Sequence, residues 1–331
     1  MYRTHNIFLK RVVDSMKALL IGSGAVGLAI GASLSDVGWD LELFAKGKTK
    51  EAVEKNGIVR KGLFPSVVIP AGKVRIYEKL QAIEEGHYDF ILVCTKTTIS
   101  AEIAEELGHN KHILKASGKI VLFQNGFGND EVFLKFFDKQ QIYSARVITG
   151  FTRPELNISE VTVHAAPMLI GSLYGNSLDC ILPLAKGIND GGIPCEVTEE
   201  IGKALWAKML YNCTLNPMGA IFNVNYGKLT ETSYSTYIMN KIIDEIFQVM
   251  IAAGYSSYWE NAESYKKEFY EKLIPSTYDH RSSTLQDIER KNKTEIDSLT
   301  HVIIKLGRKL NIDVPYNDMI YNIIKTRECF Y

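Results

Sequence analysis

A glycine-rich turn near the start of the chain constrains the fold more than any other feature. Ala18–Ile21 is a short apolar run that predicts a strand, and a helical pattern follows as far as Val37. Between them, residues 22–27 read Gly-Ser-Gly-Ala-Val-Gly. In this pattern the first glycine permits a tight turn, the second lets the backbone approach a pyrophosphate, and the third allows close helix–strand packing. We therefore expect a dinucleotide at this helix start; the alternative is a glycine turn without a ligand.

The end of the next predicted strand, Asp40–Phe44, bears on the choice of cofactor. Rossmann proteins that prefer NAD place an acid near this strand end, where it binds the ribose 2′-hydroxyl. Here a cation, Lys46, follows instead. Lys46 would attract the 2′-phosphate of NADP, and a carboxylate would repel it. The sequence favours NADP over NAD, and a solvated loop lysine is the alternative reading.

Further strands alternate with helical stretches, which predicts a doubly wound parallel sheet. These strands are Val67–Ile69, Val74–Ile76, Tyr88–Cys94 and Lys119–Phe123. Ligands bind outside the carboxyl ends of such strands. Lys96 and Asn125 follow two of these ends, so we expect both to face the cofactor. The strand-like segments 142–151 and 161–173 suggest an antiparallel addition that completes the first domain.

The second half of the chain reads as helical, beginning with residues 198–217. At about 100° per residue, Lys208, Asn212 and Asn216 share an arc of roughly 80° with two apolar residues. Buried polar groups are costly unless they have partners. This face should therefore meet a polar cleft or a ligand; alternatively, the Lys208 stem packs while its ammonium reaches water.

Three later helices are expected over residues 237–253, 264–273 and 283–310. Ser283 and Gln286 fit a capping box at the start of the last one. The same helix start would equally suit a substrate carboxylate. Glu295 lies about three turns further on and reads by default as a surface acid.

The length, the charge and the cysteine content of the chain indicate how many domains it has and which classes of partner it is not expected to bind. A chain of 331 residues suggests two domains. Its 38 basic and 38 acidic residues give no reason to expect nucleic acid or an anionic membrane as partner. No apolar run reaches the roughly 18 residues of a membrane span. The five scattered cysteines fit neither a zinc site nor a disulfide framework, so we expect no metal and a cytoplasmic location.

The predicted fold is an α/β N-terminal Rossmann-like doubly wound sheet followed by an all-α C-terminal domain. We place the NADP-binding domain at residues 16–197 and the helical substrate and catalytic domain at residues 198–331. Residues 1–15 read as an extension outside the fold. An upstream start codon before Met16 is the favoured explanation, and a transit peptide is the alternative.

Taken in order, these residues resemble the ketopantoate reductase (2-dehydropantoate 2-reductase) family over nearly the whole chain from Met16. The resemblance rests on the glycine loop, Thr95-Lys96, Gln124-Asn125-Gly126, the helical row Leu205-Trp-x-Lys208-x-x-x-Asn212-x-x-x-Asn216-Pro217, and Ser282–Asp287 followed by Thr294–Asp297. The helical row is far more specific than the glycine loop.

The resemblance implies an NADP-dependent oxidoreductase that reduces 2-dehydropantoate to D-pantoate for pantothenate and coenzyme A biosynthesis. It implies that Lys208 is the general acid and that Glu295 helps to hold the site, these two being the catalytic residues. The implied substrate-binding residues are Asn125, Lys208, Asn212, Asn216 and Ser283. The implied cofactor-binding residues are Gly22, Ser23, Gly24, Ala25, Val26, Gly27, Lys46, Lys96, Asn125 and Glu295.

Three departures from the family pattern leave the substrate open. Tyr226 stands where one type of member has a substrate-contacting Asn, Gln124 replaces a His found in some members, and residues 153–157 align poorly. The alternatives are therefore a reductase of another 2-oxo acid on the same scaffold and a non-catalytic NADP-binding regulatory protein. The sequence also does not decide between a monomer and a homodimer.

Overall fold

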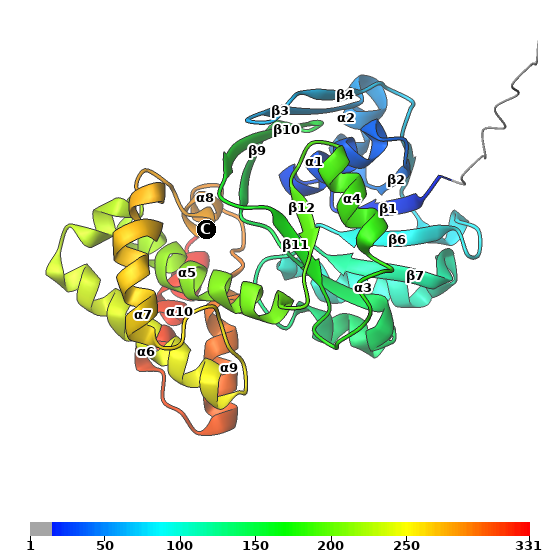
Figure 1. Cartoon of the computed structure of the whole chain (residues 1–331). Coiled ribbons are helices and arrows are strands. Elements are labelled where there is room, and N and C mark those ends of the chain that lie inside the picture. The colour runs from blue at the N-terminus through cyan, green and yellow to red at the C-terminus, as the bar shows by residue number, and fades with distance from the viewer. Residues whose placement is uncertain (1–14) are drawn as a thin grey trace, which may run out of the picture.

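The computed structural model describes residues 15–331. An eight-stranded sheet forms the centre of the N-terminal half, in the order β12-β11-β8-β7-β6-β1-β2-β5 (Figure 1). The strands from β5 to β8 are parallel, and β11 runs antiparallel to β8 and parallel to β12. The strands are β1 (Lys17–Ile21), β2 (Asp40–Phe44), β5 (Arg75–Tyr77), β6 (Tyr88–Val93), β7 (Leu114–Leu122), β8 (Ile142–Arg146), β11 (Met168–Gly171) and β12 (Cys195–Val197).

Both faces of this sheet are buried, which explains why its strands read as continuous apolar runs. Ala18 and Leu20 of β1 enter the core shared with helices α1 (Ala25–Asp36) and α4 (Leu182–Asp190). Leu19 and Ile21 point to the opposite core, which packs against α3 (Ser100–His109). Helix α2 (Gly47–Asn56) connects β2 to the next strand. The doubly wound Rossmann-like sheet is thus confirmed.

A second, four-stranded sheet in the order β4-β3-β10-β9 lies against α1 (Figure 1). Its strands are β3 (Ile58–Gly62), β4 (Val67–Ile69), β9 (Thr149–Glu155) and β10 (Ile158–His164). The sequence analysis missed β3 and assigned residues 67–69 to the main sheet, which was wrong. The reason is that β3 pairs antiparallel with β4 and parallel with β10, a strand about a hundred residues away along the chain.

The two strand-like segments after Phe137 each divide between the two sheets. Residues 142–151 supply β8 and the start of β9, and residues 161–173 supply the end of β10 and β11. The expected antiparallel addition holds for β11 against β8 and for β9 against β10. It is wrong for β8, which extends the parallel sheet beside β7.

The C-terminal half is helical and packs around its own core. The long helix α5 (Ile201–Phe222) is followed by α6 (Ser233–Ala252), α7 (Ala262–Glu268, continued by a π-helical segment at Phe269–Leu273), α8 (Ser283–Glu289), α9 (Thr300–Leu310) and α10 (Pro315–Glu328). Trp206 and Met209 of α5 face this core together with Ile243 of α6. Within residues 15–331, no helix combines the length and the apolar character that crossing a bilayer requires.

The single helix expected over residues 283–310 is wrong, since α8 ends at Glu289 and α9 begins at Thr300. Lys291 lies in the left-handed region at φ 57°, which stops α8. Thr294 then donates from its backbone N and its hydroxyl to Glu328 of α10, at 2.8 and 2.6 Å. These contacts hold the connecting segment against α10, and that segment carries Glu295.

Candidate active site

The glycine turn between β1 and α1 has the shape of a phosphate-binding loop. Gly22 has φ +101°, and a Cβ there would lie 2.4 Å from Thr95 N. A Cβ on Gly27 would lie 2.1 Å from Gly22 O, whereas one on Gly24 would meet nothing within 4 Å. The first turn of α1 has no acidic residue and no side-chain cap, and the hydroxyl of Ser23 is buried without a partner among the described residues. The loop therefore fits an anionic group such as a pyrophosphate.

A group of cations lies at the start of α2. Lys46 is the N-cap residue of α2, and its ammonium lies 5.0 Å from the centre of the Phe44 ring. Arg153 of β9 donates to Thr49 Oγ1 in the first turn of α2, at 2.9 Å. In residues 15–331, neither Lys46 nor Arg153 has a carboxylate within 4.0 Å. Sequence reasoning missed Arg153, and the poor alignment of residues 153–157 was its only signal.

Three predicted residues from distant parts of the chain form one hydrogen-bonded relay. Lys208 of α5 donates from Nζ to Asn125 Oδ1 at 2.6 Å and also to the carbonyl of Val147, just beyond β8. Asn125, in the loop after β7, donates from Nδ2 to Glu295 Oε2 at 3.0 Å. Asn125 thus holds the ammonium on one side and the carboxylate on the other.

The loop after β6 fixes the other end of this relay. Glu295 Oε1 accepts from the backbone N of Thr97 at 3.0 Å and from its hydroxyl at 3.2 Å. Lys96 forms an ion pair with Asp287 of α8. Burial raises the pKa of Asp287, against the opposing effect of the Lys96 ammonium. Thr97 and Asp287 were not predicted as site residues, although both stand next to or within the motifs that carry the family resemblance.

The surroundings of Lys208 lower the pKa of its ammonium. Burial lowers the pKa of Lys208 from 10.5 to about 8, with Glu295 raising it and Arg146 lowering it further. Arg146, on β8, is only 8% exposed, and its Nη1 has no partner in the described part of the chain. Sequence reasoning did not single out Arg146, because nothing in its local pattern marks it as charged and buried.

The remaining predicted substrate residues lie near this relay without joining it. Asn212 is partly buried and makes no side-chain hydrogen bond within residues 15–331. Asn216 is 3% exposed and accepts from the hydroxyl of Tyr226. Ser283 is exposed at the first position of α8. The capping prediction for Ser283 is wrong, because Ser282 is the N-cap and accepts from Leu285 N at 3.0 Å.

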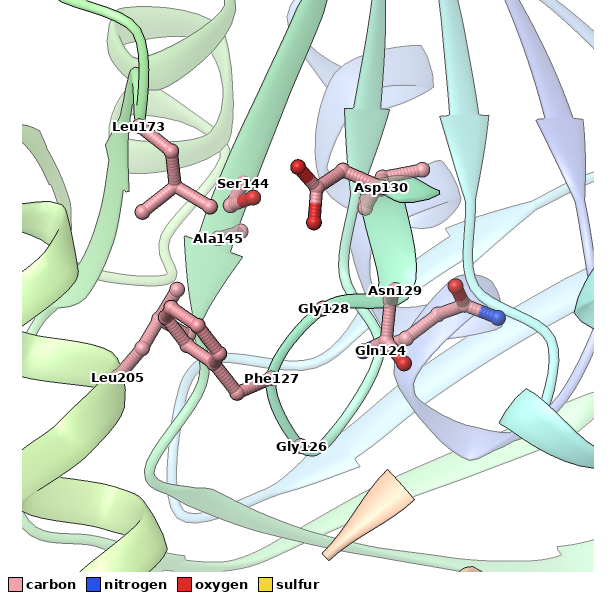
Figure 2. A pocket seen from close by; sticks show the side chains of 11 residues that line it. Gln124, Gly126, Phe127, Gly128, Asn129, Asp130, Ser144, Ala145, Leu173 and Leu205 are labelled. Carbon is pink, nitrogen blue, oxygen red and sulfur yellow. The ribbon is translucent and has the colours of Figure 1, made fainter. Parts of the chain in front are cut away.

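Figure 2 shows a small pocket beside the loop that carries Asn125. Phe127 and Leu205 form part of its apolar lining, with Leu173 and Ala145. Its lining includes none of the relay residues. Gln124, which also borders it, uses its amide to bond Thr95 O at 3.1 Å and Ser100 Oγ at 2.7 Å. Gln124 therefore ties its loop to the segment that follows β6.

The fold and the site together define a class: oxidoreductases with a Rossmann-like sheet followed by a helical C-terminal region. Family models narrow this further. Residues 18–174 match the model described as "Ketopantoate reductase PanE/ApbA", and residues 200–328 match "Ketopantoate reductase PanE/ApbA C terminal". The chain belongs to the ketopantoate reductase family.

Individual relatives agree with this assignment. The 2-dehydropantoate 2-reductase of Aquifex aeolicus is 34% identical over 95% of this chain and 98% of its own length. That of Pyrococcus horikoshii is 27% identical over 95% and 98%. A PanE/ApbA family ketopantoate reductase structure from Ralstonia eutropha has a TM-score of 0.81 at 25% identity, covering 95% of this chain and 98% of that chain. D-mandelate dehydrogenase, solved with NADH and anilino(oxo)acetate, has a TM-score of 0.80 at 20% identity over 95% and 98%, which is a likeness of fold alone.

Proposed function

We propose that this chain reduces 2-dehydropantoate to D-pantoate with NADPH, a step of pantothenate and coenzyme A biosynthesis. The observation that carries the proposal is the Lys208 ammonium, held on Asn125 at 2.6 Å, with a pKa of about 8. A ketone that receives a hydride becomes an alkoxide, which needs a positioned cation and a proton. A lysine with this pKa is a far better acid at neutral pH than an ordinary one.

Each residue of the relay has a part in this reaction. The nicotinamide cofactor, when bound, supplies the hydride. Lys208 donates its proton to the C2 oxygen of the substrate. Asn125 fixes the ammonium by accepting its hydrogen bond, and Glu295 fixes Asn125 while stabilising the charged form of Lys208. Donors along α5 and at the start of α8, namely Asn212, Asn216 and Ser283, bind the carboxylate and the remaining oxygens of the substrate.

Two features support NADPH over NADH. Lys46 and Arg153 lie at the start of α2 without carboxylate partners in residues 15–331. The strand end that would carry an acid in an NAD-preferring protein carries none. The 2′-phosphate of NADPH would supply the missing negative charge there.

The test is the loss of nicotinamide absorbance when the purified chain is mixed with NADPH and 2-dehydropantoate. Parallel reactions contain NADH, and a panel of simple 2-oxo acids replaces the substrate. We expect rapid oxidation of NADPH that is selective for 2-dehydropantoate and falls as pH rises through about 8, as Lys208 loses its proton. Faster turnover of another 2-oxo acid would mean that this acid, and not 2-dehydropantoate, is the substrate. If the chain binds NADPH but turns over none of the 2-oxo acids, the result would favour the alternative of a non-catalytic regulatory protein.

The cytoplasmic location stays a prediction, and for the oligomeric state the two alternatives are a monomer and a homodimer. Light scattering on the purified chain distinguishes a monomer from a dimer. Fractionation of cells that produce the chain tests its location.

A further inference from the structure

Tyr226 stands beside the polar row of α5 and has no part in the proposed reaction. It precedes the short 3-10 segment Gly227–Thr230 and is 2% exposed. Its hydroxyl donates a hydrogen bond to Oδ1 of Asn216, which is 3% exposed. A buried phenol and a buried amide that pair with each other are fixed in orientation, because turning either one would leave polar groups unsatisfied.

The surroundings of Tyr226 hold its ring in place. Its backbone N donates to His280 O at 3.1 Å, and its ring centre lies 5.1 Å from that of His280. On another side it meets Tyr211 edge-on at 5.7 Å. Burial raises the pKa of Tyr226 well above its ordinary value, so the hydroxyl keeps its proton and remains a donor. The segment around His280 leads into α8, which packs on α5 (Figure 1).

The pairing determines what Asn216 offers to a ligand. An asparagine amide has one acceptor oxygen and an NH2 group with two donors. Because Oδ1 faces Tyr226, the NH2 group faces the other way. In residues 15–331 Nδ2 makes no hydrogen bond, and it is not among the fully buried atoms that lack a partner. Asn216 therefore presents only donors, on the same side of α5 as Lys208 and Asn212.

We propose that Tyr226 is a positioning residue that locks the Asn216 amide, so that its NH2 group donates to an oxygen of the 2-oxo acid. The inference rests on the proposed function, since it requires a 2-oxo acid bound along α5. It also makes a statement about specificity. A substrate with an acceptor oxygen at this point is favoured over one that places a donor or an apolar group there, since the amide cannot turn to suit it.

A double-mutant cycle tests the proposal. We expect Tyr226→Phe to raise the KM for 2-dehydropantoate about tenfold, the effect of one misplaced neutral hydrogen bond. The kcat and the affinity for NADPH, measured by fluorescence, should change less than about twofold, a split that a purely structural defect would not produce. Asn216→Ala should raise KM to a similar extent. In the double variant KM should equal that of Asn216→Ala, because Tyr226 acts through Asn216.

Two further variants sharpen the test. Tyr211→Phe removes a hydroxyl from the same aromatic cluster, where it bonds Thr277 Oγ1 at 2.5 Å, and should leave KM unchanged. Asn216→Asp keeps an oxygen for Tyr226 but has no donor, so it should raise KM at least as much as Asn216→Ala. The Asn216→Asp variant therefore tests the proposal even if Tyr226→Phe does not fold. A wild-type KM in Asn216→Asp or Tyr226→Phe, or additive effects in the cycle, would overturn the inference alone. Absence of turnover by the unmodified chain with every 2-oxo acid would overturn the proposed function as well.

Discussion

Burial disfavours the charged form of Lys208, and this has a measurable effect on stability. In the folded chain its pKa is about 8, whereas the pKa of an unfolded lysine is about 10.4. Between these values the unfolded state binds more protons, so the contribution of Lys208 to the free energy of unfolding rises with pH. Below about pH 8 both states are protonated, and the full penalty of burying the ammonium is present.

Lys208→Met removes this titration. From about pH 7.5 to about pH 10, we expect the unfolding free energy of the unmodified chain to gain about 1–3 kcal/mol on that of the variant. Urea unfolding of both proteins across this range provides the measurement. Parallel curves would mean that Lys208 has an ordinary pKa. Turnover should fall by orders of magnitude in the same variant, with NADPH binding retained.

Glu295 and Arg146 are the charged residues that act on Lys208, with opposite signs. Glu295→Gln removes the charge that raises the Lys208 pKa, so the alkaline fall in kcat/KM should move to lower pH. Arg146→Met removes the charge that lowers the pKa, so the same fall should move to higher pH. Each displacement should be about one pH unit. A pH–rate profile of the three proteins decides this, and displacements in the same direction would contradict the assignment.

Two adjacent serines at the start of α8 have different predicted roles, one in stability and one in substrate binding. Ser282 is the N-cap and is fully buried, while Ser283 is exposed beside it. Ser282→Ala should lower the free energy of unfolding by about 1 kcal/mol, since a helix donor loses its partner. Ser283→Ala should leave stability within about 0.5 kcal/mol but lower kcat/KM for the 2-oxo acid. Thermal unfolding and steady-state kinetics on both variants distinguish the two roles, and unaltered kinetics in Ser283→Ala would remove it from the site.

Helix α2, which follows β2 of the main sheet, and strand β9 of the second sheet meet at the predicted 2′-phosphate site. Arg153→Met should raise the KM for NADPH about five- to tenfold while leaving that for NADH nearly unchanged, because only NADPH carries the phosphate. Arg308→Met, which removes an exposed arginine of α9 that pairs with Asp318 of α10, is the matched control. An equal rise of the KM for NADPH and for NADH in Arg153→Met would show that Arg153 stabilises α2 and does not bind the 2′-phosphate.

The sequence predicted those elements whose boundaries are local and failed where distant contacts decide. Strand β2 was predicted with its observed bounds, since Asp40–Phe44 is flanked by a turn and by a loop lysine. The break between α8 and α9 was missed because the helical pattern continues through it. Contacts from Thr294 to Glu328 on α10 help to hold that break, and no local propensity reports them.

Across the whole molecule, the candidate site is assembled from both halves, and this limits what sequence alone can predict. Lys208, Asn125 and Glu295 could be singled out because they stand within motifs. The pairing of Lys96 with Asp287 spans 191 residues, and the bond from Arg153 to Thr49 links strand β9 of the second sheet to helix α2. Such partners depend on how the two halves pack, so the structure was needed to find them.

The two halves also pack closely at Gly126, next to Asn125. Gly126 has φ +94°, and a Cβ there would lie 2.1 Å from Ser298 O, in the segment that carries Glu295. Gly128, in the same loop, has φ +76°, but a Cβ there would meet only the carboxylate of Glu131, with Oε1 at 3.4 Å. A substitution at either position would therefore strain the backbone, but only one at Gly126 would also make the two halves of the chain collide.

Gly128→Ala should destabilise the chain by about 1 kcal/mol through strain alone and leave turnover nearly intact. Gly126→Ala should cost at least about 2 kcal/mol more and strongly reduce kcat, because the relay from Lys208 to Glu295 passes through the adjacent Asn125. Chemical unfolding and single-turnover kinetics measure both effects. Equal behaviour of the two variants would mean that contact between the halves at this loop does not set the geometry of the site.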